Sequence, residues 1–449
     1  RKAGLEVDDP PPADSVAQER QSGPAAADDS QPEKSSPDSQ SGRSDMAIAV
    51  LPMRSSDDLD MVALAEELTE DITAGLTRFT YLDVVGGGGQ ATGDSDPGLA
   101  ARNLSARYVL TGRLRRAGRT ARVAVKLIDA QSGSHLWAES YDSSLEDSNL
   151  FDVQDDLTDR IVATVADQQG VLIRSMIAAV REKPIEQLNA RDAVFLMFDY
   201  MQIITPELHF RVREALERAV EVEPNSADAW ACLSIVYGDE YKHDYNVKPD
   251  SLDRALVAGR RAADIDKACQ HAYYALAQTH FFRRDFGRFR NAADRAVQIN
   301  GRDGNTVAFM GILRAYAGDL EEGTALIERA LALNPHYPGW YRFGIYYRHF
   351  AREEYAEALA EAQAMNMPGY YATHMAVGAA AGLAGRLDVG REAVRELLAV
   401  YPAFADRGYA EFKKWIADEA VLERYFVGLQ LSGLEVADSG LPPVLPEGA

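Results

Sequence analysis

The second half of the sequence carries a pattern of paired helices. Residues 305–335 read NTVAFMGILRAYAGDLEEGTALIERALALNP, and two amphipathic helices fit this stretch with a turn at residues 317–319. Small side chains let two helices of a hairpin cross closely, and a proline ends the second helix. The positions that fit this description are Gly311, Gly318, Ile327, Ala330 and Pro335.

The same pattern recurs in register along the chain. Steps of about 34 residues connect Ala296, Ala330 and Ala364, and further proline-ended units close at Pro224 and Pro402. This period resembles that of tetratricopeptide repeats. One unit cannot bury its own apolar face, so several units must stack into a solenoid. We therefore expect five or six helical hairpins in residues 189–402.

The composition limits the classes of partner. The 449-residue chain has a net charge of -22 and a pI near 4.8, which argues against nucleic acid or an anionic membrane surface as a direct partner of this segment. No apolar run is long enough to span a bilayer. The two cysteines, Cys232 and Cys269, fall at different heights of adjacent repeats, which disfavours a disulfide.

The first residues differ in composition from the remainder. Residues 1–45 are rich in Pro, Ser, Asp and Gln and hold almost no large apolar side chains, so they predict a disordered linker. A linker implies a part that it tethers. Because the sequence begins at Arg1 rather than at methionine, we expect it to be a fragment or a processed product of a longer protein.

Residues 46–180 predict a small α/β domain. Leu64, Leu68, Ile72 and Leu76 form the apolar stripe of a helix that Asp57 and Asp58 can cap. Alternating and apolar runs predict strands, and the last three of these should form an antiparallel meander. The expected strands are 46–52, 81–85, 107–114, 122–129 and 134–141, and the further helices are 97–104 and 150–180.

Three stretches of this region resemble the TolB-type amino-terminal domain of large bacterial signalling proteins, where tetratricopeptide repeats follow it. They read IAVLP, AEELTEDITAGLTRF and ARYVLTGRLRRAGRTARVAVKLIDAQSGSHLWAESYD. The resemblance, which covers residues 46–402, implies an upstream class III adenylate or guanylate cyclase domain, or a winged-helix DNA-binding domain as in CadC-like regulators. Met53 departs from the aromatic residue common in the family, and the glycines at 86–89 replace a serine-rich loop.

The sequence predicts no catalytic, cofactor-binding or metal-binding residues. The glycine run at 86–89 lacks the spacing of a phosphate-binding loop and the Walker lysine. Asp285-Phe286-Gly287 spells a kinase metal motif without the other kinase motifs. The eight histidines show no metal-ligand spacing, and no GxSxG is present. We expect the chain itself to be inert as an enzyme.

A groove between stacked repeats is the expected binding site. First helices of the hairpins line such a groove, and aromatic residues with an arginine suit a protein or peptide partner. The alternative is that many of these side chains pack against neighbouring helices. The predicted groove residues are His271, Tyr274, Gln278, Phe282, Ile312, Tyr316, Arg342, Tyr346, His349 and Phe350.

The repeats favour a non-catalytic sensory or scaffolding module that binds a protein or peptide. The TolB-type resemblance implies that this module regulates an upstream cyclase in cyclic AMP signalling. The alternatives are the regulatory half of a CadC-like transcription regulator and a free-standing adaptor. In bacteria the chain would face the periplasm if a transmembrane helix precedes it, and the cytoplasm otherwise; a homodimer is compatible with this. The predicted segments are 1–45 (linker), 46–180 (α/β domain), 189–402 (repeats), 403–431 (capping helices) and 432–449 (tail).

Overall fold

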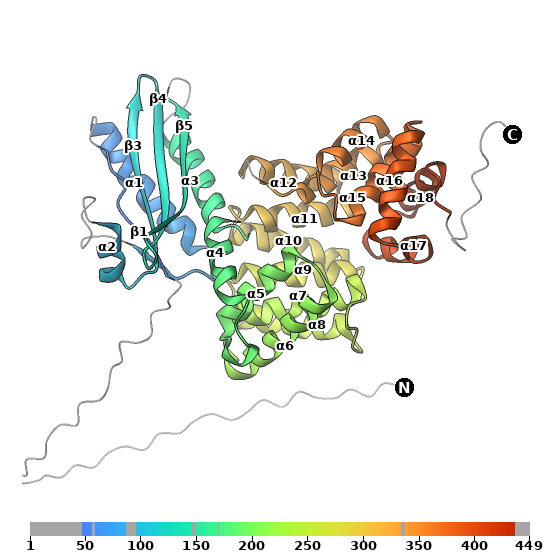
Figure 1. Cartoon of the computed structure of the whole chain (residues 1–449), viewed down its shortest axis with the longest axis horizontal. Coiled ribbons are helices and arrows are strands. Elements are labelled where there is room, and N and C mark those ends of the chain that lie inside the picture. Colours follow the sequence, from blue (N-terminus) through green and yellow to red (C-terminus); the bar gives the residue numbers. More distant parts are fainter. Residues whose placement is uncertain are drawn as a thin grey trace, which may run out of the picture. The chain divides into compact units, whose positions relative to one another are not determined.

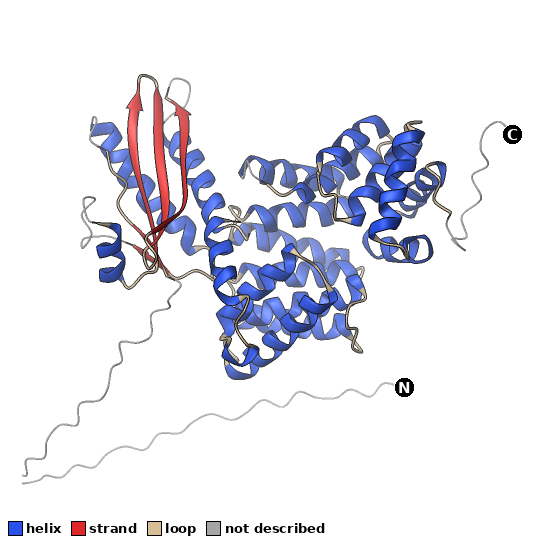
Figure 2. Cartoon of the chain, in the orientation of Figure 1, coloured by secondary structure: helices blue, strands red, loops and turns tan. Residues whose placement is uncertain are grey.

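The computed structural model describes residues 47–55, 59–86, 96–145, 150–168, 170–333 and 337–435. The predicted linker, Asp57, Asp58, Pro335, most of the glycine run and the end of the tail lie outside these residues. All strands and helices from β1 to α18 belong to one compact unit. The strands gather in one sheet with helices beside it, and the described chain after β5 is helical (Figure 2). The expected fold class, a small mixed-sheet α/β domain followed by an all-α solenoid, is confirmed.

The sheet has five strands in the order β2-β1-β3-β4-β5. β1 pairs in parallel with β2 and β3, and β3, β4 and β5 form the expected antiparallel meander. One predicted strand is wrong in position, because residues 81–83 turn before the strand and Tyr81 packs inward instead of pairing. The strands are β1 (Ile48–Val50), β2 (Val84–Gly86), β3 (Tyr108–Ala117), β4 (Thr120–Asp129) and β5 (Ser134–Ser144).

Helices cover both faces of the sheet (Figure 1). The predicted stripe of α1 (Leu59–Thr77) is fully buried with α3 (Leu150–Ala166) against one face, where it meets the inward-facing residues of β3 and β4. α2 (Pro97–Leu104) packs its alanines against β1 and Val109 on the other face. The period-two alternation of the strands thus separates two cores, as expected for a pleated sheet.

The predicted helix at 150–180 is two helices. α3 ends at Ala166, and α4 (Val171–Val180) begins after a break that includes Asp167, Gln168 and Gly170. A Cβ on Gly170 would lie 2.6 Å from the carbonyl oxygen of Val165 and 2.7 Å from that of Asp167, so the tight turn requires glycine here. The apolar period runs through the break, which explains why the sequence pattern suggests one helix.

Helical hairpins make up the chain from Ala190 to Val400 (Figure 1). Each pairs a first helix with the antiparallel helix that follows. The pairs are α5 (Ala190–Gln202) with α6 (Pro206–Val222), α7 (Ala227–His243) with α8 (Ser251–Ile265), α9 (Gln270–Phe282) with α10 (Phe286–Ile299), α11 (Gly304–Tyr316) with α12 (Leu320–Leu333), α13 (Phe343–Ala351) with α14 (Tyr355–Ala364), and α15 (Tyr371–Leu383) with α16 (Leu387–Val400).

The α11/α12 hairpin confirms the pattern on which the repeat prediction depends. A Cβ on Gly311 would lie 2.7 Å from the carbonyl oxygen of Gly323, so the two helices cross at glycines. The turn runs through Gly318, whose φ of 101° suits glycine. Ile327 and Ala330 are buried, but Ala364 is exposed and Met365 is buried instead, because α14 starts one residue later than an even period places it.

Two helices follow the hairpins, within the region where terminal helices were expected. α17 (Phe404–Trp415) and α18 (Glu419–Leu431) differ in their contacts. α18 packs against α15, and a Cβ on Gly382 would lie 1.9 Å from the carbonyl oxygen of Gly428. α18 therefore covers the last first-helix of the solenoid, as a cap should.

Candidate functional site

The sheet domain contacts the hairpins through a buried polar junction, which we define as Tyr81, Asp167, Gln168, His271 and Asn305. The break after α3 turns Asp167 and Gln168 toward the starts of α9 and α11. The backbone N–H of Asn305 donates to Asp167 Oδ2 at 3.1 Å, and its side-chain Nδ2 donates to Gln168 Oε1 at 3.0 Å. The ring of Tyr81 lies 5.4 Å from that of His271, tilted by 30°, and its hydroxyl donates to the carbonyl of Ala166.

His271 connects this junction to the half-buried carboxylate of Asp228. Its Nδ1 lies 3.1 Å from Asp228 Oδ1, and its Nε2 lies 2.9 Å from Gln168 Nε2. Because a carboxylate only accepts, Nδ1–H donates to Asp228 and Nε2 accepts from the amide. Burial alone would raise the pKa of Asp228, but the hydrogen bonds from His271 and Thr80 outweigh it, and the pKa is lowered.

A buried carboxyl belongs to Asp303, which caps the start of α11. Its Oδ1 accepts from the Thr306 N–H at 3.2 Å and its Oδ2 from the Thr306 hydroxyl at 2.6 Å. Burial raises its pKa in spite of these hydrogen bonds. The junction therefore fixes the sheet domain to α9 and α11 by groups that water does not reach.

Seven of the ten predicted groove residues are buried in the described chain, and they fall in three places. His271 belongs to the junction. Tyr346 and Phe350 pack with Tyr425 of α18, with Phe350 4.1 Å from that ring. The remaining four lie on α9 and α11, where Tyr274 stacks 5.1 Å from Phe309. Large side chains at these positions fill the spaces between helices, and so Gln278, Phe282 and Ile312 are also buried.

Three predicted groove residues are half-buried. Arg342 donates to Glu361 Oε2 at 2.7 Å, and the Nδ1 of His349 lies 2.6 Å from Glu354 Oε2. Tyr316 is the third, at the end of α11. Phe282 and Tyr316 both contact the indole of Trp415. Partner binding by the ten residues stays a prediction.

Helix α17 lies on the ends of the first helices α7, α9 and α11. The ring of Trp415 is 5.0 Å from that of Phe282 and 6.5 Å from that of Tyr316. The ammonium of Lys242 lies 5.8 Å from the indole, within the range of a cation–π contact. Trp415 thus brings together residues from three consecutive hairpins.

Polar contacts on both sides of the indole fix α17 there. Lys414 Nζ donates to the carbonyl of Tyr241 at 2.9 Å and to Asp244 Oδ2 at 2.9 Å. Arg407 Nη2 donates to the same Asp244 oxygen at 3.1 Å. On the other side, Arg284 donates to the carbonyl oxygens of Lys413 and Ile416.

A longer loop places Asp244 beside α17. Seven residues, 244–250, connect α7 to α8, whereas three connect α9 to α10 and three connect α11 to α12. The loop contains three non-glycine residues of positive φ, Asp244, Asn246 and Asp250. Asp and Asn tolerate this conformation better than other residues.

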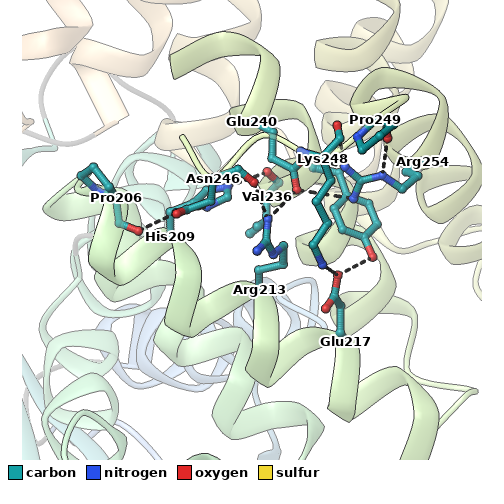
Figure 3. A network of polar contacts seen from close by, with 11 residues as sticks. Pro206, His209, Arg213, Glu217, Val236, Glu240, Asn246, Lys248, Pro249 and Arg254 are labelled. Carbon is teal, nitrogen blue, oxygen red and sulfur yellow. Dashed lines mark hydrogen bonds and ion pairs between the residues drawn. The ribbon is translucent and has the colours of Figure 1, made fainter. Parts of the chain in front are cut away.

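The loop is held by a polar network around Glu240, which is fully buried (Figure 3). Arg213 Nη1 donates to Glu240 Oε1 at 3.0 Å and to the carbonyl of Asn246 at 2.7 Å. Glu240 Oε2 accepts from the backbone N–H of Lys248 at 3.0 Å and from Arg254. A buried carboxylate with two guanidinium partners is the arrangement that makes such burial tolerable.

A histidine completes this network (Figure 3). His209 Nε2 lies 3.0 Å from the carbonyl of Val236, and its Nδ1 lies 3.1 Å from Asn246 Nδ2. The carbonyl must accept from Nε2–H, so Nδ1 accepts from the amide and the ring is neutral. Burial lowers the pKa of His209, which agrees with the neutral ring.

Other chemistry is limited in the part of the chain that the structure describes. No group of three or more His, Cys, Asp or Glu side chains there is arranged to hold a metal ion. Cys232 and Cys269 are buried free thiols. Among the described helices, none has the length and apolar character needed to cross a membrane.

Sequence reasoning singled out His271, Phe282 and Tyr316 but missed the residues that contact them from outside the hairpins. Tyr81 stood in a predicted strand, Asp167 and Gln168 stood inside a predicted helix, and Trp415 and Lys414 stood in a predicted cap. Gly170 was the available signal for the break, since an isolated glycine in a helical pattern often marks an end. The loop at 244–250 makes its repeat unit longer than the period of the others, and this extra length was a signal for a special role.

Two sequence relationships give this architecture a context. The model of the second domain of HilA/YgeH-like transcriptional regulators matches residues 44–160, which include the whole sheet. The Rhizobium meliloti (strain 1021) protein named "Putative adenylate cyclase 3" is 34% identical over 244 residues, covering 51% of this chain and 39% of that protein. The chain therefore spans about two fifths of the length of this relative.

Among solved structures, a chain described under "Functional Characterization of Pseudomonas Aeruginosa pilF" aligns with 54% of this chain and 97% of its own length. The identity is 15% and the TM-score is 0.35. A score this low does not define a shared fold.

Proposed function

We propose that this chain is a non-catalytic regulatory module of a bacterial signalling protein, and that the catalytic part is a class III adenylate or guanylate cyclase. The observation that carries the proposal is the 34% identity over 244 residues to a relative named as an adenylate cyclase, most of which lies outside the matched region. The resemblance of the sheet region to the TolB-type amino-terminal domain, with repeats after it, supports the same architecture.

The junction supplies a physical route for regulation. Asp167 and Gln168 follow directly after α3 of the sheet domain and bind the starts of α9 and α11. A partner that changes the packing of the hairpins would therefore displace α3 with them. Such a partner shifts an equilibrium only if it binds two arrangements of the module with different affinity.

The proposed partner is a protein or a peptide that binds the hairpins. Tyr316 and Phe282 lie together at the ends of first helices, and aromatic residues of this kind are frequent in binding sites. The side of the membrane on which the module lies depends on the preceding part of the protein. If that part contains a transmembrane helix, as the TolB-type resemblance implies, the module would face the periplasm.

A second candidate function rests on the match of residues 44–160 to the HilA/YgeH-like regulator domain. In this case the module would regulate an upstream DNA-binding domain, as in the CadC-like alternative. The two candidates differ in the chemistry of the upstream domain, since a cyclase converts ATP or GTP and a winged helix binds DNA in a salt-dependent way.

Cyclase assays on the full-length protein test the first function. We expect the full-length protein to form cyclic AMP or cyclic GMP, the chain alone to form neither, and removal of the chain to change the rate of the remaining protein several-fold. Sequence-specific DNA binding without cyclase activity would favour the second function. A full-length cyclase whose rate is the same with and without this chain would reject the regulatory role.

A further inference from the structure

α17 differs from a cap in the surface that it covers. α18 covers the end of the solenoid, whereas α17 reaches back to the ends of α7, α9 and α11. Its contacts therefore span three earlier hairpins, and those with Asp244 and Arg284 join residues more than one hundred positions apart. A partner helix bound along first helices would make contacts of this kind.

The covered surface combines an aromatic patch with specific polar groups. We define it as the α17 floor: Tyr241, Asp244, Phe282, Arg284 and Tyr316. Phe282 and Tyr316 contact the indole of Trp415, and Asp244 accepts from Lys414 and Arg407. The backbone carbonyl of Tyr316 accepts from the N–H of Ala417 at 3.1 Å. The floor thus selects a tryptophan with a cation beside it.

The second half of α17 can separate from the floor. Within α17 only Phe404 and Gly408 are buried, and both belong to its first half. The half that carries Lys414 and Trp415 is half-buried, and 51% of the Arg407 side chain is exposed. Exposed ion pairs contribute little to stability because water can replace either partner. Separation of this end from the floor would uncover the half-buried Trp415 and the buried side chains of Ile416 and Phe282. The buried Phe404, in the first half of α17, need not move.

We propose that the α17 floor is the partner-binding site of this module, and that α17 occupies it as an internal competitor. The partner is a helical protein segment that presents a tryptophan beside lysine or arginine, in imitation of Lys414 and Trp415. Charge complementarity with Asp244 and the aromatic contacts to Phe282 and Tyr316 select it. This inference rests on the proposed partner-binding function and names the class of partner.

A labelled peptide of residues 403–418 tests the floor directly. Fluorescence anisotropy measures its binding to the whole 449-residue chain, to Arg407→Glu/Lys414→Glu, and to Lys413→Glu. The double variant loses the contacts of its own α17 with Asp244, so we expect it to bind the peptide at least tenfold more tightly than the wild type. Lys413→Glu is the matched control, because Lys413 pairs with Glu419 instead, and it should bind as the wild type does.

Two further variants keep the test decisive. Trp415→Ala removes the indole without a change of charge and should give the same gain, even if the double variant folds poorly. Asp244→Asn tolerates the positive φ at this position and removes the carboxylate, so its addition to either variant should weaken peptide binding several-fold.

Three outcomes would overturn the proposal. They are equal binding of the peptide by the wild type and by both opened variants, a gain that survives Asp244→Asn, and a dimer in light scattering, which would assign the floor to α17 of a second copy. None of these measurements uses cyclic nucleotide as its readout. A negative result in these binding tests therefore leaves the proposed regulation of a cyclase untouched. Conversely, peptide binding without any effect on cyclase rate would reject the regulatory role and leave the binding site in place.

Discussion

Two segments outside the hairpins contact the first helices, and they do so in opposite ways. At the junction, Asp167 and Gln168 are 0% and 3% exposed, and their partners are buried as well. At the α17 contact, the side chains of Arg407 and Asp244 are 51% and 39% exposed. Buried polar groups lose much when a partner is removed, whereas water replaces a partner at the surface. We infer that the junction is a permanent joint and the α17 contact is an exchangeable one.

The largest effect is expected in the network that shapes the loop under α17. Glu240→Ala would leave Arg213 buried without its carboxylate, and breaking a buried pair in this way costs about 3–5 kcal/mol. Urea denaturation of the whole chain measures this loss. Lys248→Ala is the matched control in the same loop. Its ion pair with Glu217 is partly exposed, and its loss should cost at most about 1 kcal/mol. Equal losses for the two variants would contradict the assignment of the network.

The junction should show the next largest effect. Gln168→Ala would leave the Asn305 amide and His271 Nε2 buried without their shared partner, at a cost of about 1–3 kcal/mol. The control is Arg302→Ala, which removes a partly exposed pair with Asp159 at the same interface. We expect hydrogen exchange at the starts of α9 and α11 to rise in the first variant and to change little in the second. If both variants behave alike, the junction is no firmer than a surface contact.

The sequence predicts the parts of this molecule that follow a period. Leu64 and Leu68 are four residues apart on one helix face, Val123 and Val125 alternate along a strand, and Ala296 recurs one repeat later as Ala330. The helices, the meander and the hairpins could therefore all be predicted. The junction and the α17 contact could not be predicted. Asp167 and Asn305, like Lys414 and Asp244, are more than one hundred residues apart, and their pairing follows no period. Ten residues on first helices were predicted to line a groove, but register alone does not say which side chains other helices cover.

A fall in pH should reduce the stability contributed by His209 and His243, near the loop at 244–250, and should increase that contributed by Asp303 at the start of α11. Burial lowers the pKa of His209 and of His243, the latter to about 3, so both stay neutral in the fold while their unfolded forms protonate near pH 6.5. A lowered histidine pKa gives stability that is present above the unfolded pKa and is lost as the pH falls toward the folded pKa. For His243 this loss approaches about 1.4 kcal/mol per pH unit between the two pKa values. Burial raises the pKa of Asp303, so its contribution is lost as the pH rises and recovers in acid.

Urea titrations at pH 7.5 and 5.5 check these signs. His209→Gln should reduce the loss of stability between the two pH values. Asp303→Asn removes the opposing contribution of that carboxyl, which grows as the pH falls toward 3.8. Asp228 should not matter in this range, since its lowered pKa affects stability only in stronger acid. The same pH dependence in the wild type and in both variants would exclude these groups as its source.

Arg407→Ala should cause the smallest loss of global stability of these variants and the largest increase in local amide exchange of α17. Arg407→Ala removes an exposed pair with Asp244 and should lower the free energy of unfolding by less than about 1 kcal/mol. Because α17 buries few of its own side chains, we expect amide exchange across residues 404–415 to become several-fold faster while the junction keeps its protection. Arg391→Ala, which removes an exposed pair with Asp388 on α16, is the control and should leave α17 exchange unchanged. Faster exchange at the junction in Arg407→Ala would mean that the two contacts open together, and the distinction between a permanent and an exchangeable contact would fail.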